Sequence, residues 1–220
     1  MDKRIERMSK FWKVLPNLLL LIVSAFPLTS CIGIDASAKI DAKGAGTLSI
    51  EYQISKDFAQ LGSLESTPML PLPLSREDIE RGLQGVQGVT LKSYSKSERG
   101  DNIIVSLMLA FDSPSSLAVY LDPNGKLAQY QQENGRSHLK LSFGDTVQPL
   151  DPQMKAEISE KLKPYRFKFA LEAPGAAPEI SVKNGDFFQV TTSGKKTTLE
   201  CSMTDIITCD RVPEIDITWQ

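Results

Sequence analysis

Apolar and polar residues alternate along much of the chain after residue 31. Every second position from 32 to 40 is Ile or Ala, and every second position from 48 to 54 is Leu, Ile or Tyr. A turn with two glycines, 41–46, separates the two stretches. Because strand side chains alternate between two faces, the pattern predicts a β-hairpin with one apolar face. Further strands are predicted at 89–94, 103–111, 138–143, 165–171, 187–190, 197–199 and 215–219.

Three segments between these strands have helix-start signals. Ser75 with Asp78 is typical of a capping box, and it precedes Ile79 and Leu83 at helical spacing. The other two starts are Ser113-Pro114, with a short helix through Leu121, and Asp151-Pro152, followed by Met154, Ile158 and Leu162. Strands joined mostly by hairpins, with few helices, predict an α+β fold: an antiparallel β-sheet with two main helices packed on one face.

The first thirty residues have a different pattern. Five Lys and Arg side chains precede a short apolar stretch from Leu15 to Phe26. That stretch is shorter than the roughly 20 apolar residues that span a bilayer, and Pro16, Asn17 and Pro27 interrupt its edges. The order is that of a secretory signal peptide, which we assign to residues 1–30.

The leader ends in Leu28-Thr29-Ser30-Cys31. This sequence resembles the lipobox of bacterial lipoproteins, a Leu and two small residues before a Cys. The resemblance implies that the Cys31 thiol carries a diacylglycerol and that the chain is cut before it. An ordinary signal peptide cut nearby is the alternative. The expected location is extracytoplasmic and lipid-anchored, on the periplasmic side of the inner or outer membrane or at the cell surface.

The mature chain, residues 31–220, has a length that suits a single domain. Without the five basic and two acidic leader residues it holds twenty Lys and Arg against twenty-five Asp and Glu, a net charge of about minus five. No basic cluster is present that would neutralise a run of phosphates, so a nucleic-acid partner is not expected. The membrane, reached through the lipid anchor, is the partner that the sequence indicates.

Cys201 and Cys209 remain once Cys31 is assigned to lipid. In an oxidising compartment they are expected to form a disulfide, across a hairpin around Thr204-Asp205 that begins a C-terminal element, 201–220. A metal site is the alternative, but His138 is the only histidine and four soft ligands cannot be assembled. We expect no metal and no other cofactor.

The Cys31–Ser55 stretch, in which the lipidated Cys leads straight into a strand, a turn with glycines and a second strand, resembles the LppM-type lipoprotein domain family. A late strand ending at Pro174-Gly175, followed by Asn184-Gly185, is similar to a second part of that family. The resemblance covers much of 31–200 and implies an α/β or α+β sandwich-like body with an apolar cavity for lipid or glycolipid. It implies no catalytic residues.

Two functions follow, and neither is enzymatic, because no catalytic triad, phosphate loop or acid-base pair is present in the sequence. The first is a lipid-anchored domain that binds a lipid or another apolar ligand. Its candidate lining is Val105, Leu107, Leu109, Phe167 and Phe169, with the proline-rich segment 68–74 as a flap. The alternative is an envelope scaffold or protein-interaction lipoprotein with a solid core.

Overall fold

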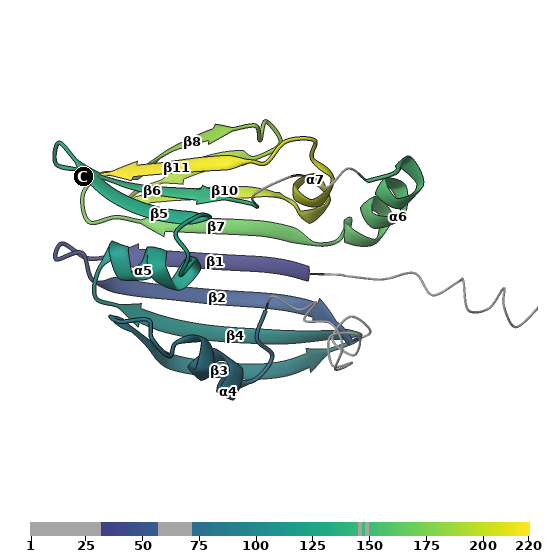
Figure 1. The fold of residues 1–220 in the computed structure, drawn as a ribbon, viewed down its shortest axis with the longest axis horizontal. Coiled ribbons are helices and arrows are strands. Elements are labelled where there is room, and N and C mark those ends of the chain that lie inside the picture. Colours follow the sequence, from purple (N-terminus) through teal and green to yellow (C-terminus); the bar gives the residue numbers. More distant parts are fainter. Residues whose placement is uncertain (1–31, 57–71, 145–146, 148–149) are drawn as a thin grey trace, which may run out of the picture.

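A computed structural model describes residues 32–56, 72–144, 147 and 150–220 (Figure 1). The predicted leader, Cys31 as the predicted lipidation site, and the first part of the 68–74 segment (68–71) lie outside the described residues. The first described residue, Ile32, is also the first residue of strand β1.

Seven strands form the larger of two sheets, called sheet A, in the order β3-β4-β2-β1-β7-β10-β9. Their bounds are β1 Ile32–Ile40, β2 Gly46–Ser55, β3 Val89–Arg99, β4 Asn102–Phe111, β7 Arg166–Glu172, β9 Gln189–Ser193 and β10 Lys196–Ser202. Neighbouring strands are antiparallel, with the exception of β1 and β7, which run parallel. The predicted hairpin of β1 and β2 is confirmed, with Ala36 opposite Ile50.

Four strands form the second sheet, called sheet B, in the order β5-β6-β11-β8. They are β5 Ala128–Glu133, β6 Arg136–Ser142, β8 Glu179–Lys183 and β11 Glu214–Trp219, all antiparallel. Leu139, Ile215 and Ile217 of this sheet are no more than 1% exposed and belong to the same apolar core as Leu171 and Leu199 of sheet A. The two sheets therefore pack face to face, as Figure 1 shows for β5, β6, β8 and β11 over β7 and β10.

The predicted fold class, α+β with two main helices on one face of an antiparallel sheet, is wrong. The helices are α4 Arg76–Gly82, α5 Pro114–Leu121, α6 Pro152–Leu162 and α7 Met203–Thr208. α4 and α5 contribute Ile79 and Leu117 to the core, but α6 packs against α7 beyond the ends of the strands (Figure 1). Sheet B covers much of the apolar face of sheet A. The three apolar side chains of β11 must be buried against another element, just as the apolar face of a helix must be.

The helix starts themselves are confirmed. Ser75 caps α4 by accepting a hydrogen bond from the backbone N–H of Asp78, Ser113 caps α5, and Asp151 caps α6. These caps depend only on neighbouring residues, which explains why sequence patterns locate them well.

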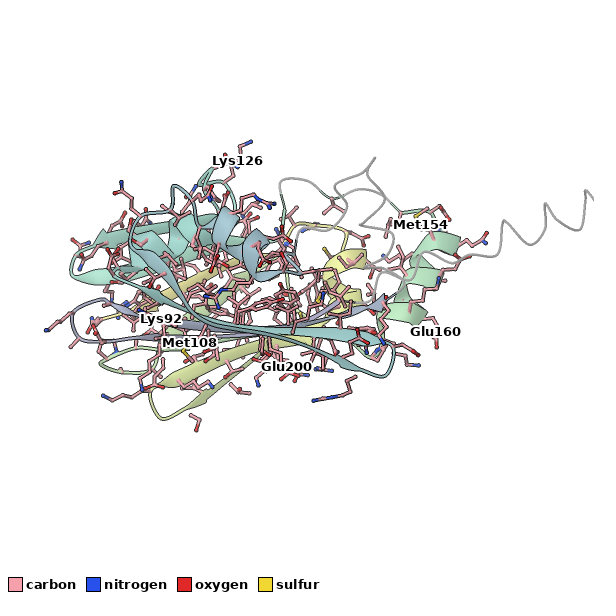
Figure 2. All side chains as sticks on the ribbon, turned by 90° about the horizontal axis from the view of Figure 1, so that it is seen from below. Lys92, Met108, Lys126, Met154, Glu160 and Glu200 are labelled. Atoms are coloured by element: carbon pink, nitrogen blue, oxygen red, sulfur yellow. The ribbon has the colours of Figure 1, made fainter. Side chains whose placement is uncertain are left out.

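The side chains of both sheets fill the space between the layers, whereas labelled charged side chains such as Lys126 and Glu200 lie on the outside (Figure 2). The segment Leu72–Leu74 lies over β2 and β3, because the hydroxyl of Tyr52 donates to the carbonyl of Pro73 and that of Tyr94 to the carbonyl of Leu74. The described part of the proline-rich segment is thus fastened to the inner face of sheet A.

A buried carboxylate holds the turn between α5 and β5. Asp122 is 7% exposed and accepts hydrogen bonds from the backbone N–H groups of Asn124, Lys126 and Leu127. These hydrogen bonds, of which the one from Leu127 has the largest effect, lower the pKa of the Asp122 carboxyl below its usual value. The charged carboxylate is therefore part of what joins α5 to sheet B.

We expect Asp122→Asn to destabilise the protein at neutral pH, because an amide accepts these N–H groups less well than a carboxylate does. A lowered folded-state pKa stabilises the fold above the ordinary value of 3.8, and this contribution disappears as the pH falls through the folded value. The gap in unfolding free energy between wild type and variant should therefore narrow below pH 3.8 in urea titrations. A gap that stays constant down to the acid transition would contradict this role.

Candidate functional site

The predicted ligand-lining residues all lie on the inner face of sheet A. Val105, Leu107 and Leu109 alternate along β4 and are between 0% and 5% exposed, and Phe169 of β7 is equally buried. Phe167 is partly buried against the same apolar cluster. Two strands separate β4 from β7, so the two groups lie about 14 Å apart at strand spacings of roughly 4.8 Å. Other core side chains, including Tyr52 and Ala38, occupy the inner face between them.

Three hollows among the described residues lie instead on the outer faces of the sheets. One of about 480 Å³ is on sheet B, and two of about 420 and 330 Å³ are on sheet A, where they share Asp35 and Glu51. None of these three is bordered by the described residues 72–74 of the proposed flap. Charged side chains border all three, so a ligand bound there would meet charged groups.

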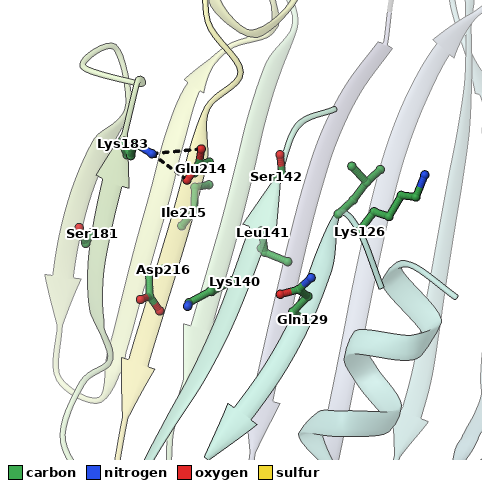
Figure 3. A pocket seen from close by; sticks show the side chains of 11 residues that line it. Lys126, Gln129, Lys140, Leu141, Ser142, Ser181, Lys183, Glu214, Ile215 and Asp216 are labelled. Carbon is green, nitrogen blue, oxygen red and sulfur yellow. Dashed lines mark hydrogen bonds and ion pairs between the residues drawn. The ribbon is translucent and has the colours of Figure 1, made fainter. Parts of the chain in front are cut away.

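The hollow on sheet B, which we call the sheet B hollow, is built from two cross-strand rows. Strand pairing places Gln129, Lys140, Asp216 and Ser181 in one row across all four strands, and Ser142, Glu214 and Lys183 in the next. Because every second side chain points outward, both rows face the solvent, and Lys126 and Leu127 border them at the start of β5 (Figure 3). The sheet B hollow thus presents positively and negatively charged side chains next to one another.

Charge pairing inside the sheet B hollow is incomplete. Lys183 Nζ lies 3.3 Å from a Glu214 carboxylate oxygen, so these two neutralise each other. Asp216 Oδ1 lies 3.4 Å from Nδ1 of His138 in the neighbouring row, yet this buried oxygen accepts no hydrogen bond. The Lys140 side chain points toward Asp216 in Figure 3, without an ion pair to it. A ligand with polar groups could use both side chains.

Within the described residues, no group of three or more His, Cys, Asp and Glu side chains is placed to hold a metal ion. Nδ1 of His138, the only histidine, lies 3.3 Å from the Thr218 hydroxyl and 3.4 Å from Asp216 Oδ1, so one ring nitrogen faces both groups. Nothing in the sheet B hollow itself supplies a nucleophile activated by a base.

Sequence reasoning missed part of this surface because 126–137 reads as a polar connector. The missed strand, β5, has Ala128 and Tyr130 facing inward and Gln129 and Gln131 facing outward. Its period of two is present in the sequence, but only two of its side chains are apolar, and Gln is a weak strand former. The alternation could have identified it.

Four phenylalanines close the sandwich at the end where β1 begins, an end we call the Ile32 pole. Phe143 follows β6, Phe167 is the second residue of β7, and Phe187 and Phe188 lie between β8 and β9. Phe143 and Phe167 meet edge to face at a centroid distance of 5.0 Å, and Phe187 and Phe188 at 4.8 Å. Phe188 is 9% exposed, and the other three rings are only partly buried. The ring cluster is therefore both part of the core and partly open to its surroundings.

The Cys201–Cys209 region differs from the expected hairpin. Cys201 is buried at the end of β10, and the chain then forms helix α7, capped by Ser202, before Cys209. The two sulfurs are not bonded to each other in this structure. Burial raises the pKa of the Cys201 thiol to about 12. The Cys209 thiol donates a hydrogen bond to the carbonyl of Ile206. An argument from period-two spacing does not apply across a helix.

The disulfide stays a prediction that the compartment motivates. We expect peptide mapping under non-reducing conditions, on protein purified from the native envelope, to recover one linked peptide with Cys201 and Cys209. Two alkylatable thiols in that preparation would reject it. Cys201→Ala supplies the control, because it should leave Cys209 free to react.

Comparisons with known proteins do not extend these observations. No protein-family model matches the chain, and no curated protein matches it significantly. No helix of the described residues is long and apolar enough to cross a membrane.

Proposed function

We propose that the chain is a lipid-anchored bacterial envelope lipoprotein whose β-sandwich is a non-enzymatic interaction domain. The basic and apolar leader followed by Leu28-Thr29-Ser30-Cys31 supports the anchor. The start of β1 at Ile32 is compatible with it, because the folded body then begins at the residue after the lipidated cysteine.

One observation favours an interaction domain over a ligand carrier. The side chains predicted to line a cavity are packed in a continuous core with Leu48, Tyr52 and Leu199. A closely packed interior leaves only voids about the size of a water molecule, whereas a site for an acyl chain is largely preformed. The three hollows described above face outward and are bordered by charged side chains, which suits a polar or protein partner.

Lipid binding stays a second candidate because of the phenylalanine cluster at the Ile32 pole. Phe143, Phe167 and Phe187 are only partly buried, and they lie between the two sheets on the side where the chain would reach the membrane. Aromatic rings of this kind could part to admit the acyl chain of a lipid or glycolipid.

Native mass spectrometry of the full, lipidated protein released from its membrane distinguishes the two functions. The interaction domain predicts a mass equal to the polypeptide with its covalent acyl groups. A further lipid that stays bound in wild type and is lost in Phe167→Ala would support lipid binding instead. Val190→Ala is a matched control, because this strand side chain is 43% exposed and lies outside the ring cluster.

A further inference from the structure

Helices α6 and α7 lie beside the point where the chain enters the domain. A Cβ placed on Gly33 would lie 3.4 Å from the ring of Tyr165, which follows α6. The carbonyl of Tyr165 accepts a hydrogen bond from the backbone N–H of Met203, the first residue of α7. The hydroxyl of Thr204 in α7 donates to the carbonyl of Ser159 in α6 at 3.3 Å. These contacts join both helices to the first residues of β1.

The inner faces of the two helices are already used in packing. Leu162, Tyr165 and Met203 form a small buried cluster, against which Ile158 and Ile206 pack. Two large apolar side chains have no place in it: Met154 of α6 is 48% exposed and Ile207 of α7 is 46% exposed. Figure 2 shows Met154 on α6, beyond the ends of the strands.

We propose that α6 and α7 form a membrane-contacting face, in which Met154 and Ile207 enter the headgroup region of the bilayer that holds the protein. The inference rests on the proposed function, since it takes the lipid on Cys31 as the anchor. The inference specifies which surface of the domain meets the membrane, and it orients the strands away from the bilayer.

The short distance from the anchor to the fold carries the argument. One residue step is at most about 3.8 Å between Cα atoms, so a lipidated Cys31 holds Ile32 at the membrane surface. Interfacial helices bury their apolar side chains about 5–10 Å into the headgroup boundary, which is within reach of helices packed against Tyr165. The exposed side chain of Val119 is placed differently: it is on α5, whose Pro114 lies beside Gly44 in the β1–β2 turn at the far end of β1.

Tryptophan quenching by brominated lipids tests the proposal on the full, lipidated chain. Met154→Trp, Ile207→Trp and the control Val119→Trp are reconstituted into vesicles of phosphatidylglycerol and brominated phosphatidylcholine. All three sites are between 43% and 48% exposed, so the new ring should not disturb folding. After the leader is removed, Trp219 is the one tryptophan of the wild-type chain, and its emission is subtracted as a common background.

We expect brominated lipid to reduce the emission added by Met154→Trp and Ile207→Trp about twofold, since these rings lie at the acyl boundary. The emission added by Val119→Trp should be unchanged. Vesicle flotation accompanies each measurement. Protein that floats without selective quenching overturns the inference and leaves the anchor standing, whereas protein that fails to float overturns the anchor and the inference together.

Discussion

Replacing Cys31 by alanine should release nearly all of the protein from membranes. Each buried methylene of an acyl chain contributes about 0.8 kcal/mol, so two or three chains bind almost irreversibly and their loss leaves no comparable contact. The variant should also keep its leader or be cut elsewhere. The measurements are membrane fractionation and incorporation of labelled palmitate into wild type and Cys31→Ala.

Cys209→Ala is the matched control for this experiment. It removes a different cysteine, which lies after α7, and it should leave both palmitate incorporation and membrane association unchanged. If Cys31→Ala incorporates palmitate to the wild-type extent, the assignment of the anchor to Cys31 is wrong. The alternative reading, an ordinary signal peptide, would then explain the leader.

Leu109→Ala should lower the free energy of unfolding by about 2–5 kcal/mol, the usual cost of truncating a leucine in a packed core. Leu109 is fully buried in β4, with Leu48 of β2 and Leu91 of β3 directly opposite it. In a solid core, the methyl groups removed leave a cavity that the surrounding strands cannot close. Chemical unfolding of the two proteins measures the difference.

Met108→Ala is the control in the same strand. Met108 faces outward and is 40% exposed, so its truncation should change stability by less than about 0.5 kcal/mol. If Leu109→Ala costs as little as Met108→Ala, the inner face of β4 borders empty space. Such a result would favour the ligand cavity over the solid interaction domain.

Local patterns of the sequence predict many of the elements correctly. The period of two in 32–40 and 103–111, and the caps at Ser75 and Ser113, concern residues close together in the chain. A strand with one apolar face, or a helix with a capped start, can be identified from such neighbours alone. The apolar character of Val105, Leu107 and Leu109 is also visible in this way.

The site is less predictable than the elements that build it. Lys140 and Asp216 face one another because β6 pairs with β11, strands that are far apart in sequence. Likewise, Met154 appears in the sequence as part of the inner face of its helix, yet it is exposed because α6 packs on α7 rather than on a sheet. Neither the pairing of Lys140 with Asp216 nor the exposure of Met154 can be read from the sequence of a single segment.

The sequence by itself predicts a leader and a lipid-attachment site at Cys31, and it determined which face of most strands is apolar. Tertiary structure alone decided how the strands divide into two sheets, that β1 and β7 pair in parallel, and that sheet B rather than α6 covers the core. The physical reason is that periodicity specifies which face of an element avoids water but not which surface covers it. That choice depends on hydrogen bonds and packing contacts between segments that are distant in the sequence, and these contacts form only in the folded chain.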